Sequence, residues 1–150
     1  VPALQWMTSR FERRNNVACQ FRTTHESISL PVGVPLVAYR FAQEALTNIS
    51  KHAQATRVVV DLSLSGGVLS LEVSDNGRGL TPDDLTKARS FGLRGLHQRA
   101  STAGGWVDIS SGAEGTTLLL SVPLREAKAH EPQLMPMVDR EHDPSGWGVL

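Results

Sequence analysis

Hydrophobic positions recur with two different periods along the chain, and these periods predict its elements. Apolar residues spaced three and four apart predict helices over residues 3–14 and 35–53, and one from Phe91 to the Gly104-Gly105 pair. Thr81-Pro82-Asp83-Asp84 supplies a cap, a proline at the first helical position and two acids in the first turn, which predicts a short helix from Thr81 that ends by Ser90. Alternating or β-branched runs predict strands over residues 17–22, 56–64, 68–74, 106–110 and 116–123. Helices and strands mixed in this order predict an α/β two-layer sandwich.

The segment Asp75-Asn76-Gly77-Arg78-Gly79 follows the predicted strand 68–74. A carboxylate at a strand end, with glycines two and four residues later, lets the backbone turn and approach a flat polar ligand, because glycine lacks a Cβ atom. The alternative is a strand followed by an Asn-Gly turn and a hairpin. The segment by itself does not distinguish these two interpretations.

The predicted helix 35–53 has two distinct sides. It starts at Pro35, whose missing N–H costs nothing at the first helical position, and its core face consists of Ala38, Ala42, Ala45, Leu46, Ile49 and Ala53. The other side carries Arg40, Glu44, Asn48 and Lys51, with His52 at its edge. A carboxylate, an amide oxygen and a lysine in line can hold a hydrated Mg²⁺ and the phosphates it bridges. The alternative is a solvated face with an i,i+4 ion pair between Arg40 and Glu44.

Glycine recurs at the start of the last predicted helix, in Gly92-Leu93-Arg94-Gly95-Leu96. The first N–H groups of a helix can bind an anion, whereas the alternative is a glycine kept for close packing. The histidines His25 and His97 give no comparable indication of a functional site. We interpret His25, beside Glu26 in a segment without helical periodicity, as an exposed loop residue, and His97 as a packing or surface residue.

Composition places the chain among ordinary soluble proteins. Its 150 residues are enough for one domain with a core of its own. Fifteen basic residues balance 15 acidic residues, so the overall charge does not indicate nucleic acid or membrane. Cys19 is the only cysteine, which excludes an intrachain disulfide. No apolar run approaches the roughly 18 residues of a spanning helix, and we expect a cytoplasmic protein.

Taken in order, the polar segments resemble the nucleotide-binding (Bergerat, or GHKL) fold of histidine kinases, Hsp90, type II topoisomerases and the MutL group. Residues 43–53, Gln-Glu-Ala-Leu-Thr-Asn-Ile-Ser-Lys-His-Ala, resemble its N box, in the version found in sensor histidine kinases related to the nitrate sensors and DesK. Asp75–Gly79 resembles the first glycine box, Gly92–Leu96 the second and Gly115-Thr116 the last. The resemblance covers about residues 15–124. It implies a mixed, mostly antiparallel sheet with helices on one face.

The resemblance also implies ATP and Mg²⁺ as cofactors, and it assigns separate residues to the adenine and to the metal. Asp75 would accept a hydrogen bond from the adenine amino group, supported by Thr116. Gly77 and Gly79 would let the backbone lie against the base. Asn48 would coordinate the Mg²⁺, and Glu44 would either order the water shell of the metal or act as a base.

A third set of residues would contact the phosphates. Lys51 and His52 would contact phosphate oxygens, and the second glycine box, with Gly92, Leu93, Gly95 and Leu96, would present backbone amides to them. Residues 80–91 would form a short lid. This box departs from the family pattern, because Ser90-Phe91-Gly92 stands where Gly-x-Gly is usual; we expect a stiffer lid hinge.

No histidine in the chain matches the phosphoacceptor of this subfamily, which lies on a long helix of a dimerisation domain. We therefore predict three parts. Residues 1–14 form a helix joining to an absent upstream dimerisation domain, residues 15–124 are the ATP-binding catalytic domain, and residues 125–150 are a disordered tail.

The resemblance thus implies a catalytic fragment of a protein-histidine kinase. It would bind Mg·ATP and donate the γ-phosphoryl group to a histidine on the separate dimerisation domain, from which it passes to a response regulator with a helix-turn-helix output domain. No direct nucleic-acid partner is expected, and the parent protein is compatible with a membrane anchor. Two alternatives stay open: an anti-sigma-factor-type serine kinase or an ATPase of the same fold, and a degenerate interaction module without nucleotide binding.

Overall fold

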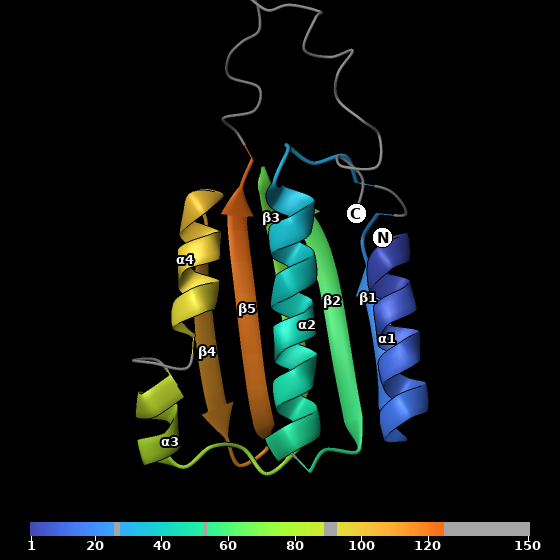
Figure 1. Ribbon diagram of the computed structural model, residues 1–150, viewed down its shortest axis with the longest axis vertical. Coiled ribbons are helices and arrows are strands. Elements are labelled where there is room, and N and C mark those ends of the chain that lie inside the picture. Colours follow the sequence, from blue (N-terminus) through green and yellow to red (C-terminus); the bar gives the residue numbers. More distant parts are fainter. Residues whose placement is uncertain (26–27, 53, 89–92, 125–150) are drawn as a thin grey trace, which may run out of the picture.

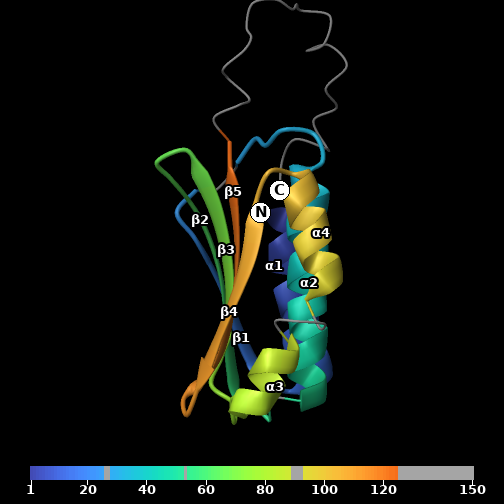
Figure 2. The ribbon, with the colours of Figure 1, turned by 90° about the vertical axis from the view of Figure 1, so that its left-hand side faces the viewer.

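A five-stranded sheet carries helices on one of its faces, as Figures 1 and 2 show. The computed structural model describes residues 1–25, 28–52, 54–88 and 93–124. The described helices are α1 (Pro2–Asn15), α2 (Val34–His52), α3 (Pro82–Lys87) and α4 (Arg94–Thr102). The described strands are β1 (Ala18–Thr23), β2 (Arg57–Ser65), β3 (Val68–Asp75), β4 (Trp106–Gly112) and β5 (Gly115–Pro123).

The strand order is β1-β2-β3-β5-β4, with β1 and β2 parallel and the other neighbouring pairs antiparallel. Parallel neighbours need a long crossover, which α2 supplies between β1 and β2. The β2–β3 pair is a tight hairpin, because Gly66 and Gly67 adopt φ of 60° and 76°, a combination that other residues rarely tolerate. The predicted α/β two-layer sandwich with a mixed, mostly antiparallel sheet is confirmed.

The hydrophobic core lies between the helices and the inward face of the sheet. On α2, the predicted core face is buried from Ala38 to Ile49, and Phe41, which the sequence analysis did not assign to it, is 1% exposed. On the sheet, alternate residues of β2 and β3 are buried, as period-two strands require. The predicted short helix is α3, and Thr81 caps it by accepting a hydrogen bond from the N–H of Asp84 at 3.0 Å.

Helix α1 packs into the same core as the rest of the described chain. Its apolar stripe of Leu4, Met7 and Phe11 is buried, and the helix contacts both β1 and α2. Its role as the join to a preceding domain remains a prediction. The predicted tail 125–150, Glu26, Ala53 and Gly92 lie outside the described residues.

The antiparallel pairing of β3 with β5 brings two distant segments to one edge of the sheet. Because β3 ends where β5 begins, Asp75 is the direct partner of Thr116 in the ladder. Helix α2 crosses above β3 and β5 and contacts both strands. The same edge carries α3, as Figure 2 shows. The fold therefore gathers the end of β3, the start of β5, α2 and α3 in one region.

Candidate functional site

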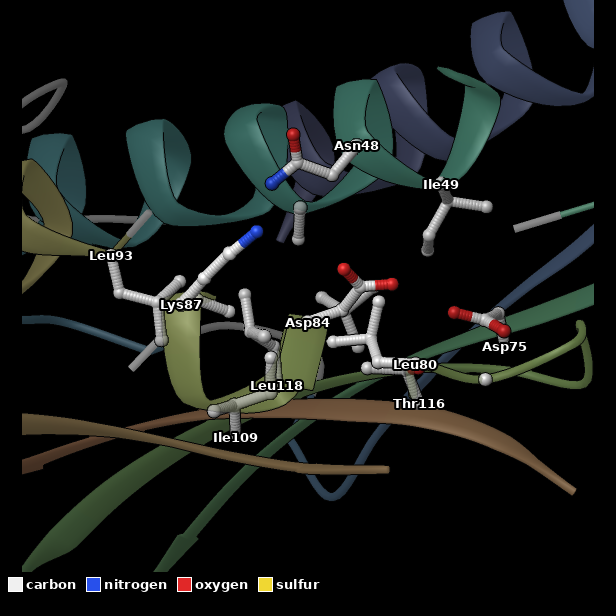
Figure 3. Close-up of a pocket in the computed structure, with 14 residues that line it drawn as sticks. Asn48, Ile49, Asp75, Leu80, Asp84, Lys87, Leu93, Ile109, Thr116 and Leu118 are labelled. Carbon is white, nitrogen blue, oxygen red and sulfur yellow. The ribbon is translucent and has the colours of Figure 1, made fainter. Parts of the chain in front are cut away.

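A cavity of about 610 Å³ opens in this region, enclosed by α2, α3 and the sheet. Most of its walls are apolar. Its lining consists of Ala45, Asn48 and Ile49 of α2, Val73 and Asp75 of β3, Gly79, Leu80, Asp84, Lys87, Ala88, Leu93, Ile109, and Thr116 and Leu118 of β5. Figure 3 shows Asp75 at one end of this cavity and Asn48 and Lys87 toward the other.

Asp75 is the buried carboxylate of the cavity, with 8% of its surface exposed. Its Oδ1 atom accepts a hydrogen bond from the backbone N–H of Gly77 at 2.7 Å. A carboxylate can accept several hydrogen bonds, so this contact orients the side chain and leaves its second oxygen for a donor in the cavity. A buried acceptor without partners is costly, and a ligand that carries an N–H₂ group at this place would satisfy it.

Asn76 links the end of β3 to the start of β2 through hydrogen bonds. Its Oδ1 atom accepts hydrogen bonds from the backbone N–H groups of Thr56 at 3.0 Å and Arg57 at 2.9 Å, and its Nδ2 donates to Thr56 Oγ1 at 3.0 Å. The hairpin interpretation of Asn76-Gly77 is therefore wrong, because the chain leaves the sheet here and continues into α3. The side chain of Asn76 supports the strand end that places Asp75.

Glycine is required at two places around the cavity because backbones meet there. At Gly79, φ is 75° and an added Cβ would collide with the carbonyl oxygen of Gly112. At Gly115, φ is 129° and an added Cβ would collide with the carbonyl oxygen of Asp75. At the last predicted glycine box, β5 therefore lies close to the backbone of the strand that carries Asp75.

Ser111 of β4 joins three segments around the cavity. Its Oγ atom accepts a hydrogen bond from the backbone N–H of Leu80 at 2.7 Å and lies 2.8 Å from Thr116 Oγ1 and 3.3 Å from the carbonyl oxygen of Gly115. A hydroxyl carries one proton, so Ser111 donates to either Gly115 or Thr116, and the second choice leaves the Thr116 proton free for a ligand. The sequence analysis did not identify Ser111.

The predicted α2 residues are only partly brought together at the cavity. Asn48 lines it. Glu44 and Lys51 are exposed on α2 and are not among the lining residues. His52 is the last residue of α2, and the structure does not describe its side chain.

The predicted second glycine box is divided in the same way. Leu93 lines the cavity, whereas Leu96 is buried in the core of the domain. Gly95 is exposed in the first turn of α4 and does not line the cavity. Gly77 is buried and contacts Asp75 without being a lining residue.

Sequence reasoning missed the apolar walls and two charged residues of α3. The walls were missed because residues such as Ile49, Ile109 and Leu118 follow the same periodicity as ordinary core residues. Asp84 and Lys87 lay within the predicted lid, and their i,i+3 spacing, which puts both on one face of a helix, was the available signal.

Of the described residues that line the cavity, the charged ones are two carboxylates, Asp75 and Asp84, and one ammonium group, Lys87. Among the described residues, no group of three or more His, Cys, Asp or Glu residues is arranged to hold a metal ion. Mg²⁺ does not require such a group, because it commonly binds through one or two protein oxygens, phosphates and waters.

The family model described as histidine kinase-, DNA gyrase B-, and HSP90-like ATPase matches residues 33–126, more than half of the chain and all of the cavity lining. The chain belongs to this ATPase family. The resemblance that the sequence predicted is confirmed, and membership supports ATP as the nucleotide. Within the described part of this ATPase-family chain, no helix is long and apolar enough to cross a bilayer.

Curated relatives of this ATPase-family chain are named as sensor histidine kinases. The chain is 37% identical over 100 residues to the sensor histidine kinase LiaS of Bacillus subtilis, covering 66% of this chain and 28% of LiaS. It is 34% identical over 118 residues to the oxygen sensor histidine kinase NreB of Staphylococcus carnosus, covering 78% of this chain and 34% of NreB. The chain thus spans about a third of these relatives.

Solved structures share the fold. The histidine kinase domain of the blue-light activated histidine kinase from Erythrobacter litoralis superimposes with a TM-score of 0.67 at 24% identity, covering 82% of this chain and 60% of that one. The catalytic domain of the histidine kinase ThkA gives a TM-score of 0.61 at 14% identity, covering 79% and 87%. At these identities the likeness shows the fold alone.

Proposed function

We propose that the cavity binds Mg·ATP and that the chain is the ATP-binding catalytic part of a sensor histidine kinase. The observation that carries this proposal is the position of Asp75, a buried carboxylate at the end of a mostly apolar cavity and directly opposite Thr116. An apolar slot with one oriented acceptor suits a purine base that presents an exocyclic amino group. Adenine has such a group, and its faces are apolar.

The base would lie between α2 and the sheet. Its amino group would donate to Asp75, with Thr116 beside it. Gly79, which lies close to the β4–β5 hairpin, has no side chain and would leave room for the ring. Ile49, Val73 and Leu118 would cover its faces. Guanine carries a carbonyl oxygen where adenine carries the amino group, so two acceptors would face each other and guanine would bind weakly.

The phosphates would extend from the base toward Asn48. The amide oxygen of Asn48 is a hard oxygen ligand that lines the cavity, which fits a role in holding Mg²⁺ together with the phosphates. Bound Mg²⁺ would neutralise charge on the transferred group. Glu44 would order water at the metal or accept a proton from its exposed position one turn before Asn48. Lys51, His52 and the amides of Gly92–Leu96 would contact phosphate oxygens.

The activity of the whole protein follows from its relatives and is part of the proposal. The γ-phosphoryl group would pass in the cytoplasm to a histidine on a dimerisation domain and then to a response regulator. Residues 1–14 would connect this part to the dimerisation domain. Phosphoryl transfer depends mainly on positioning and charge neutralisation, and a nucleotide-binding part that docks onto its substrate histidine supplies both.

The proposal is tested by isothermal titration calorimetry of the chain with nonhydrolysable analogues of ATP and GTP, each with and without Mg²⁺. We expect binding of the ATP analogue that Mg²⁺ strengthens, and weak or absent binding of the GTP analogue. Equal affinity for both analogues would contradict the assignment of Asp75. No binding of either would reject the proposed function.

A further inference from the structure

The cation that lines the cavity is not the one that the sequence predicted. Lys51 is exposed on α2 and is not among the lining residues, whereas Lys87 of α3 is one of them. Lys51 lies three positions after Asn48, which turns it about 60° around the helix from Asn48. Lys87 comes instead from the opposite side of the cavity.

The local structure of α3 explains this position. Thr81 caps the helix and its first turn holds Asp84, so the helical spacing places Asp84 and Lys87 on one face. Both residues line the cavity. Figure 3 shows the Lys87 side chain extending from α3 toward the amide of Asn48 on α2, with the Asp84 carboxylate beside it in the cavity.

Lys87 has one ion-pair partner among the described residues, and that pair is weak. Its Nζ atom lies 3.5 Å from Asp83 Oδ2. The side chains of Lys87 and Asp83 are 68% and 81% exposed, so water screens their attraction. The ammonium group can therefore leave Asp83 for a stronger anion at little cost.

A polyphosphate would be such an anion. The cavity lining otherwise carries two carboxylates, Asp75 and Asp84, which repel phosphate. A lysine binds phosphate as a point charge, and its attraction increases with the number of phosphate charges within reach. The end of the cavity between Asn48 and Lys87 therefore has the cation and the amide oxygen that a metal-bound polyphosphate needs.

We propose that Lys87 binds the β- and γ-phosphates of the nucleotide from α3, opposite Asn48. This inference rests on the proposed function, because it requires a nucleotide whose base lies at Asp75. It makes α3 a phosphate-binding element that contacts a diphosphate or triphosphate and leaves a nucleoside without this contact.

The test is a calorimetric series of adenosine, AMP, ADP and a nonhydrolysable ATP analogue with the wild-type chain and with Lys87→Ala. We expect Lys87→Ala to bind ADP and the ATP analogue roughly tenfold more weakly, and adenosine unchanged. Lys87→Arg, which keeps the charge, should retain most of the affinity. An equal loss for adenosine and the ATP analogue, or no loss for either, would overturn the role of Lys87.

A control variant separates this contact from the effect of long-range charge. Arg13→Ala removes one positive charge from an exposed position on α1 and should leave the whole series unchanged. If it weakens ATP-analogue binding as much as Lys87→Ala does, long-range charge explains the loss and the proposal is wrong. If the wild-type chain binds no member of the series, the proposed function fails. If the wild-type chain binds adenosine and Lys87→Ala does not selectively weaken the binding of ADP and the ATP analogue, only the phosphate contact is refuted.

Discussion

Asp75 and Thr116 are separated by 40 intervening residues but face each other as direct partners in the β3–β5 ladder. The register that pairs them also brings the backbone of Gly115 against the carbonyl group of Asp75. A carboxylate and a hydroxyl are thereby held side by side at the end of a mostly apolar cavity.

Asp75→Asn should weaken binding of the ATP analogue by roughly 10- to 100-fold, because the loss of a hydrogen bond to a charged acceptor costs about 1.5–3 kcal/mol. The new amide would also turn a donor toward the adenine amino group in one of its two orientations. Calorimetry measures the change. Asp108→Asn, at an exposed position of β4 away from the cavity, is the matched control and should bind like the wild type. Wild-type affinity of Asp75→Asn would refute the adenine contact.

Asn48→Ala should weaken mainly the part of ATP-analogue binding that depends on Mg²⁺, because the amide oxygen is the proposed metal ligand. We expect the affinities of variant and wild type to converge when Mg²⁺ is removed with a chelator. Thr47→Ala, which changes the neighbouring exposed residue whose hydroxyl donates to the Gln43 carbonyl, controls for damage to the helix. An Asn48→Ala loss of equal size with and without Mg²⁺ would argue against metal coordination.

Gly115→Ala should destabilise the domain by more than about 1 kcal/mol, since φ at this position disfavours any other residue and the added methyl group would collide with the Asp75 carbonyl. Urea unfolding measures the effect. Gly112→Ala, in the same hairpin but with open space around its Cβ position, should change stability much less. Similar costs at both positions would mean that the close approach at Gly115 is unimportant.

Ser111→Ala should cost about 1–3 kcal/mol of unfolding free energy, because it leaves the half-buried N–H of Leu80 without its acceptor. Ser111→Thr keeps the hydroxyl and should restore most of the loss. Urea unfolding again gives the free energy. If Ser111→Thr is as unstable as Ser111→Ala, the hydroxyl is not what stabilises this junction.

The Cys19 thiol should react slowly at neutral pH, because burial and then the nearby Glu12 carboxylate raise its pKa from 9.0 to about 11. The raised pKa favours the protonated thiol in the folded state. Its contribution to stability is therefore complete below about pH 9 and is lost as the pH rises through about 11. Iodoacetamide labelling of the folded chain should have its midpoint near pH 11, and Glu12→Gln should lower it. A folded-state midpoint near 9 would contradict this prediction.

The local pattern was informative wherever one residue type had one structural use. Gly66-Gly67 indicated a hairpin, and Thr81 followed by Pro82 indicated a helix start, and both are present. Asn76-Gly77 was ambiguous because Asn-Gly also favours hairpins. The ambiguity was resolved only by contacts of Asn76 with residues 56 and 57, about twenty positions earlier in the chain.

The sequence by itself determined the elements, the core stripes of α1 and α2, and the family, because periodicity and ordered motifs are local properties. Only the tertiary structure decided which predicted residues share a cavity. It placed Asn48 and Lys87 at the cavity and left Glu44 and Lys51 on the exposed side of α2. The physical reason is that a cavity forms where strand register and helix packing bring distant surfaces together, and neither is encoded in the spacing of a single segment.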